Sequence, residues 1–170
     1  MAAPVTIPAP RYPAKMATAA DALERIRRLP KPLVFTNGVF DVLHRGHVTC
    51  LEQARGLGAS LAVAVNTDAS VRRLRKAGNR PLNTLSDRMA VLAALAAVDL
   101  VVPFDDDTPR DLIAECLPDV LVKGGDYSAD TTAGAAEVIA AGGKFVAIPF
   151  ATPHSTSDVV RVVKLFEYRT

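Results

Sequence analysis

Apolar and polar residues alternate along this chain in blocks that predict strands and helices in turn. Short apolar runs bounded by turn-forming residues predict five buried strands, at about 33–36, 60–66, 99–104, 119–123 and 145–149. Apolar residues at helical spacing predict helices between them, at about 46–57, 85–97, 109–116, 131–141 and 156–167. Such alternation forms right-handed βαβ units and a parallel sheet. We therefore expect one α/β domain, with a Rossmann-like, doubly wound, five-stranded parallel sheet covered by helices on both faces.

Turn and capping residues divide the chain further. Thr18 with Asp21 forms a capping-box pattern for a helix at about 19–29, which two prolines then end. Four earlier prolines predict a disordered or extended tail over 1–14. Three later helix starts carry similar signals: Thr84 with Asp87, Thr108 with Pro109 and Asp111, and Ser155 with Asp158. We expect a tail and a first helix at 1–32, followed by the folded domain at 33–170.

Composition narrows the class of function. The chain has 170 residues and a formal net charge of +2, so its overall charge requires no nucleic-acid partner. Its two cysteines, Cys50 and Cys116, are far apart in sequence, which argues against a disulfide framework or a structural zinc site. No apolar run is long enough to span a membrane, and the proline-rich start lacks a signal-peptide core. We expect a cytoplasmic protein without a membrane partner.

The stretch from Leu33 to His47 is the strongest candidate for a phosphate-binding site. An apolar strand ends at Asn37-Gly38, and His44 and His47 then flank a glycine at the start of a helix. Backbone N–H groups and the positive end of the helix dipole favour an anion at such a turn. Two imidazoles there can donate further hydrogen bonds to phosphate oxygens. A pair of purely structural histidines is the alternative.

Other polar residues are expected at the carboxyl edge of the same sheet. Gly38 allows backbone N–H groups to approach a phosphate, although Asn-Gly also forms ordinary turns. Asn66 either hydrogen-bonds a ligand at this edge or simply ends its strand, with Asp68 as a helix cap. Asp41 either caps a turn or orients a histidine. The connection 67–83 is a candidate for a mobile loop over the site.

That connection carries five positive charges within nine residues: Arg72, Arg73, Arg75, Lys76 and Arg80. A charge run is usually a solvated face. A basic loop that closes over phosphorylated substrates is the functional alternative.

Three short motifs give the chain a family resemblance. His44-Arg45-Gly46-His47 matches the HxGH signature of the nucleotidyltransferase superfamily. With Thr36-Asn37-Gly38 before it and Lys123-Gly124-Gly125-Asp126-Tyr127 behind it, the chain resembles one branch, the D-glycero-β-D-manno-heptose 1-phosphate adenylyltransferases. The likeness runs from about Leu33 to about Lys164, so 33–170 is expected to be a nucleotidyltransferase domain.

The resemblance implies roles for particular residues. His44 and His47 would bind the nucleotide phosphates and stabilise charge on the α-phosphate, and Arg75 or Lys76 would supply the catalytic cation of the loop. Arg88 would contact phosphates, with a surface salt bridge as the alternative. The implied nucleotide-binding residues are Thr36, Asn37, Gly38, Phe40, His44, His47, Arg88, Lys123, Gly124, Asp126, Ser155, Thr156 and Ser157. Those for the sugar phosphate are Asp41, Asn66 and Arg80.

The implied reaction is transfer of AMP from ATP to heptose 1-phosphate, with Mg²⁺ bound mainly through the nucleotide phosphates and no metal ligands from the protein. A separate sugar kinase would supply the acceptor, and related enzymes suggest a homodimer or higher homo-oligomer. No residue pattern indicates a covalent nucleophile, so direct displacement is expected. Two alternatives stay open: a cytidylyltransferase for glycerol 3-phosphate or another alcohol phosphate, and a non-catalytic nucleotide-sensing module.

Overall fold

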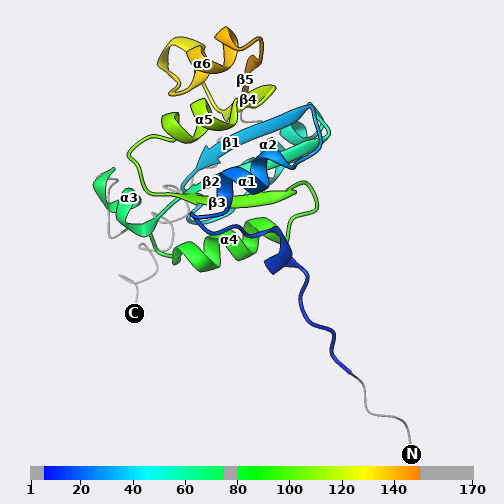
Figure 1. Ribbon diagram of the computed structural model, residues 1–170. Coiled ribbons are helices and arrows are strands. Elements are labelled where there is room, and N and C mark those ends of the chain that lie inside the picture. Colours follow the sequence, from blue (N-terminus) through cyan, green and yellow to red (C-terminus); the bar gives the residue numbers. More distant parts are fainter. Residues whose placement is uncertain (1–5, 75–79, 150–170) are drawn as a thin grey trace, which may run out of the picture.

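A five-stranded parallel sheet forms the centre of the protein. The computed structural model describes residues 6–74 and 80–149. The strands are β1 Leu33–Gly38, β2 Ser60–Asn66, β3 Leu100–Phe104, β4 Val120–Gly124 and β5 Lys144–Ile148. Their order in the sheet is β3-β2-β1-β4-β5, and every pairing is parallel (Figure 1). The predicted doubly wound sheet is confirmed, and each predicted strand agrees with an observed one to within two residues.

Alternating side chains of the strands build a core on each face of the sheet. Leu33 and Phe35 of β1 join one core, together with residues of α1 Ala22–Arg27, α5 Arg110–Cys116 and α6 Ala135–Ala140. Val34 joins the other core, with residues of α2 Arg45–Arg55 and α4 Leu85–Ala93. All seven residues of β2 are buried, as expected for a parallel strand covered on both faces.

Two aspartates at the amino ends of the strands fix how neighbours align. Asp119, just before β4, accepts a hydrogen bond from the Leu33 N–H of β1 at 2.6 Å. Asp99, just before β3, accepts one from the Leu61 N–H of β2 at 2.8 Å. Lys31 lies 3.2 Å from the Asp119 carboxylate. Partial burial of Asp119 raises the pKa of its carboxyl, but the Leu33 hydrogen bond and the Lys31 charge outweigh it, so that the pKa is lowered overall.

The segment before α1 packs along the edge strand β3, which the sequence did not indicate. Residues Tyr12–Lys15 form the short 3-10 helix η1. The Ala17 N–H donates to the Val101 carbonyl at 2.9 Å, and Lys15 Nζ donates to the Val98 carbonyl at 2.7 Å. The expectation of a disordered or extended tail is therefore wrong for its last three residues. A proline is tolerated in the first turn of a helix, where its missing N–H has no partner.

Several predicted helices differ at their ends. The first helix covers 22–27 rather than 19–29, and α4 ends at Ala93. The helix expected at 131–141 begins only at Ala135, because Gly134 adopts a left-handed conformation with φ 85° after the 3-10 turn η2 Ala129–Thr131. Thr108 is not a cap, since α5 starts after Pro109 without a side-chain cap. The helix expected at 156–167 lies outside the described residues.

The connection 67–83 is not only a loop. Its first part forms helix α3, Asp68–Arg73, whose N-cap is Thr67, with its hydroxyl accepting from the Ser70 N–H at 3.1 Å. The interpretation of Asp68 as the helix cap is therefore wrong, because the cap is the preceding residue, Thr67. Capping at Thr84 is confirmed: its hydroxyl accepts from the Asp87 N–H and contacts the Asp87 carboxylate.

Candidate active site

The candidate site lies where the direction of strand order reverses. The chain proceeds from β1 outward through β2 to β3, and then returns to place β4 on the other side of β1. In open α/β sheets, a crevice forms at the carboxyl ends of the two strands on either side of such a switch. Thr36 of β1 is in register with Val122 of β4, and Lys123 Nζ lies 3.4 Å from the Asn37 carbonyl oxygen. The predicted β1 and β4 segments are therefore brought together.

The two histidines stand side by side at the start of α2. His44 is the N-cap, and its Nδ1 accepts a hydrogen bond from the Gly46 N–H at 3.1 Å. In a neutral imidazole, an accepting Nδ1 places the proton on Nε2, which makes Nε2 a donor. The ring centroids of His44 and His47 are 3.9 Å apart, and their planes are inclined by 33°. Both imidazoles therefore belong to one small region at the positive end of α2.

Phe40 supports this pair through its ring. Its centroid is 5.4 Å from that of His47, in an edge-to-face arrangement. The backbone of Phe40 adopts φ 49°, which is uncommon for a residue with a side chain. A Cβ atom on Gly38 would stand only 3.0 Å from the Phe40 ring, so glycine makes room for this ring. The predicted role of Phe40 in nucleotide binding stays a prediction.

The three residues expected to bind the sugar phosphate contact other parts of the protein. The carboxylate of Asp41 accepts from backbone N–H groups of the segment before α4, which supports the turn-capping interpretation, and Arg80 lies 3.4 Å from it. The side-chain amide of Asn66 donates to the Ser70 hydroxyl at 2.9 Å. Contact with a sugar phosphate stays a prediction for all three.

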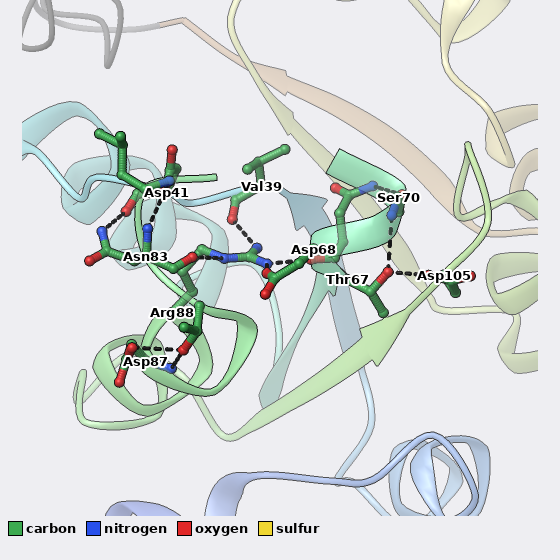
Figure 2. A network of polar contacts seen from close by, with 12 residues as sticks. Val39, Asp41, Thr67, Asp68, Ser70, Asn83, Asp87, Arg88 and Asp105 are labelled. Atoms are coloured by element: carbon green, nitrogen blue, oxygen red, sulfur yellow. Dashed lines mark hydrogen bonds and ion pairs between the residues drawn. The ribbon is translucent and has the colours of Figure 1, made fainter. Parts of the chain in front are cut away.

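Arg88 occupies an interior position that sequence reasoning missed. Its side chain has 0% exposure, so a surface salt bridge is wrong. It donates to Asp68 and to three backbone carbonyls, those of Val39, Asn66 and Asn83 (Figure 2). No sequence signal identifies these carbonyl partners, because every residue has one. Phosphate contact by Arg88 stays a prediction.

The remaining residues that the sequence singled out are Arg73 of the basic run, those at and after β4, and five that lie outside the described residues. Arg73, from the basic run, bonds Asp107 at 2.8 Å and lies 3.6 Å from Asp105. The Asp107 hydrogen bond is the main cause that raises the pKa of Arg73. The Nζ of Lys123 in β4 lies 5.5 Å from the ring centroid of Tyr127, which follows the strand, and Asp126 is exposed. The predicted residues Arg75, Lys76, Ser155, Thr156 and Ser157 lie outside the described residues.

Neither a metal cluster nor a membrane span is present in the described part of the chain. Within residues 6–74 and 80–149, no three histidine, cysteine, aspartate or glutamate side chains are grouped so that they could hold a metal ion. None of the helices in those ranges is both long and apolar enough to cross a bilayer.

The chain matches a known family of nucleotide-transferring proteins. The chain belongs to the cytidylyltransferase-like family, which matches residues 35–165. The heptose 1-phosphate adenylyltransferase branch, expected from the three sequence motifs, is confirmed by two relatives. D-beta-D-heptose 1-phosphate adenylyltransferase of Bordetella bronchiseptica is 54% identical over 156 residues, which cover 91% of this chain and 96% of that protein. Bifunctional protein HldE of a Shewanella species is 55% identical, over 84% of this chain and 30% of that protein.

Solved structures show the same fold. The lipopolysaccharide core biosynthesis protein from Thermoplasma volcanium superposes with a TM-score of 0.58 at 25% identity, covering 72% of this chain and 98% of that one. Pantothenate synthetase from Thermus thermophilus superposes with a TM-score of 0.53 at 17% identity, covering 79% of this chain and 61% of that one. The second likeness concerns the fold alone.

Proposed function

We propose that this protein transfers AMP from ATP to D-glycero-β-D-manno-heptose 1-phosphate, giving ADP-heptose and pyrophosphate. The observation that carries the proposal is the 54% sequence identity to D-beta-D-heptose 1-phosphate adenylyltransferase of Bordetella bronchiseptica, over 96% of that protein's length. The side-by-side imidazoles at the start of α2 supply the matching chemistry. This activity is a step in making the heptose precursor of lipopolysaccharide.

The reaction is a direct displacement. An oxygen of the sugar phosphate attacks the α-phosphorus of ATP, the bond from that phosphorus to the bridging oxygen breaks, and pyrophosphate leaves. A phosphate oxygen is already ionised at neutral pH, so no general base is needed. The protein contributes alignment and stabilisation of the charge that develops on the α-phosphate.

The two histidines are the proposed electrostatic centre. The accepting Nδ1 of His44 leaves Nε2 as the donor in the neutral ring, which suits a phosphate oxygen. The His47 ring contacts the His44 ring, and both residues lie at the start of α2. A donor aimed at the developing charge is worth about 10²–10³ in rate at comparable sites.

The proposed nucleotide contacts surround this centre. Thr36, Asn37 and Gly38 end β1, and Lys123, Gly124 and Asp126 end or follow β4, on the other side of the switch point. We propose that the β4 segment holds the base and ribose, where Lys123 and the Tyr127 ring lie close together. The loop cation, Arg75 or Lys76, and the hydroxyls of Ser155, Thr156 and Ser157 complete the proposed set.

Magnesium fits this site as a partner of the nucleotide rather than of the protein. Two of the carboxylates beside the site, Asp41 and Asp68, are each paired with an arginine, and no three possible metal ligands are grouped within the described residues. The donor set therefore suits an ion held mainly by phosphate oxygens, with little direct coordination by the chain. When bound, magnesium would neutralise charge on the triphosphate.

Two proposals concern partners. A sugar 1-phosphate acceptor requires a kinase-type reaction to produce it, and we propose that a separate sugar kinase does so. We also propose a homodimer or a higher homo-oligomer, which sedimentation of the full chain would test directly.

Pyrophosphate release tests the reaction and the nucleotide together. Purified protein is given magnesium and heptose 1-phosphate, with ATP and CTP in parallel. Release with ATP alone is the expected result. Clear preference for CTP would favour a cytidylyltransferase, the activity in the name of the matched family. Nucleotide binding without release for any of several sugar and alcohol phosphates would favour a sensing module.

His47→Ala tests the proposed centre. We expect turnover to fall by about 10²–10³-fold while ATP affinity falls much less, because the histidine acts most strongly on the transition state. Glu52→Ala, further along α2 and exposed, is the matched control and should retain turnover. Near-normal turnover of His47→Ala would remove this residue from the mechanism.

A further inference from the structure

Two segments that are distant in sequence are joined by side-chain hydrogen bonds next to the candidate site. The Asp41 carboxylate, with 1% side-chain exposure, accepts from the Leu82 N–H at 2.8 Å and the Asn83 N–H at 2.9 Å. In return, the Asn83 side-chain amide donates to the Asp41 carbonyl oxygen. The loop between β1 and α2 is therefore fixed to the segment that leads into α4.

Arg88 adds a second connection between the same two segments. Its Nη1 donates to the Val39 carbonyl at 2.7 Å, and its Nε to the Asn83 carbonyl at 3.1 Å. Its Nη2 reaches the Asn66 carbonyl at 2.8 Å and the Asp68 carboxylate at 2.7 Å (Figure 2). One guanidinium thus joins the ends of β1 and β2, the start of α3 and the approach to α4.

This arrangement uses the particular geometry of arginine. A guanidinium has five N–H donors in a fixed plane, and four of them have protein acceptors here. At most one N–H is left for a ligand, and the side chain has 0% exposure. The positive end of α4 disfavours a cation in its first turn, so the Asp68 carboxylate is needed to balance Arg88.

We propose that Arg88 and Asp41 are positioning residues for the transfer reaction. They hold the β1–α2 loop against the approach to α4, and thereby set the location of Phe40 and, through its ring contact, of His47. This role for Arg88 differs from the phosphate contact that the family resemblance implies. The positioning role depends on the proposed function only for its expected effect on kcat.

The test uses three variants that keep side-chain size similar: Arg88→Lys, Asp41→Asn and Asp68→Asn. Lysine reaches fewer of the four acceptors, and each asparagine removes a charge while keeping one acceptor. At 25 °C, with folding verified by circular dichroism, we expect kcat to fall about 10–100-fold, because small displacements of reacting groups are costly. The KM for ATP should stay within about threefold, since the phosphate contacts are retained.

A second readout does not depend on turnover. The imidazole NMR signals of His44 and His47 in the nucleotide-free protein should shift in all three variants if the loop moves. ATP affinity from calorimetry should change little. These measurements stay informative if the proposed acceptor is wrong, so failure of the positioning role and failure of the proposed function are distinguishable.

Arg110→Lys is the matched control, because Arg110 forms an exposed pair with Glu137 between α5 and α6. It should leave kcat and the histidine signals unchanged. Unchanged kcat and histidine signals in the site variants would overturn the proposal. A tenfold rise in the KM for ATP with kcat preserved in Arg88→Lys would overturn it in favour of phosphate binding. If Arg88→Lys does not fold, the two asparagine variants decide.

Discussion

The substitution Gly38→Ala provides a sharp test of how packing sets the histidine geometry. An added Cβ would stand 3.0 Å from Cε2 and 3.2 Å from Cζ of Phe40, closer than ordinary carbon contacts. The ring can relieve this by moving, and the same ring is in edge-to-face contact with His47. Overpacking of this kind costs about 1–3 kcal/mol. The cost appears as lost stability, or as a displaced ring that carries His47 with it.

We expect Gly38→Ala to lower kcat about tenfold, since misplacement by about 1 Å can cost about 10²-fold and the ring must shift by less. Pyrophosphate release at saturating ATP measures this, and urea unfolding measures the loss of stability. Gly56→Ala at the other end of α2 is the control, because its Cβ would meet the Gln53 carbonyl at an ordinary 3.4 Å.

Adding Phe40→Leu to Gly38→Ala removes the ring atoms that clash with the new Cβ. The double variant therefore distinguishes two reasons for a glycine at position 38: room for the Phe40 ring, and access of a phosphate to the backbone. If the ring is the reason, the double variant should be more stable than additivity of the two single changes predicts. If Gly38 instead admits a phosphate to the backbone, the KM for ATP should rise and stay high in the double variant. Purely additive stability losses would refute the packing argument.

Three further predictions concern stability and the thiols. Gly134→Ala should destabilise more than Gly142→Ala, by about 1–3 kcal/mol in urea unfolding, because both have positive φ but only the first would press a Cβ against Ile113, at 2.6 Å. The lowered pKa of Asp119 stabilises the fold above the ordinary value of 3.8 and ceases to do so as pH falls through the lowered value. Asp119→Asn should therefore be less stable than the parent at pH 7, with the difference shrinking in acid. Burial raises the pKa of Cys116 to about 12, so iodoacetamide at pH 8 should modify it only upon unfolding, as mass spectrometry would show.

The sequence predicted the sheet better than the helices, and the reason is physical. A strand buried on both faces needs a continuous apolar run, as in Ser60–Asn66, and that run is visible in the sequence. Helix α3 has only six residues and lies in a polar, basic stretch, so its periodicity is too short to detect. Another predicted helix is shorter because Gly134 adopts φ 85° at its N-cap, where Ile113 packs too close for a side chain.

The candidate site likewise has a part that the local sequence predicts and a part that depends on the fold. Local order in the chain determined the strand, turn and helix start that bring His44 and His47 together, because all three lie within one short segment. Lys123 meets the end of β1 because β4 crosses back to lie beside β1 in the doubly wound strand order, which parallel βαβ units alone do not fix.

Only the tertiary structure decided what Arg88 and Asp41 contact. Their partners are mostly backbone N–H and carbonyl groups, which every residue carries and which no residue type reveals. Arginine and aspartate side chains are usually exposed, so the residue types alone favour a solvated or ligand-binding role. The sequence by itself determined which strand ends and which helix start carry the residues expected to meet a phosphate. The fold determined which charged groups hold the protein in the shape that presents them, because that depends on which strand and helix ends meet in space.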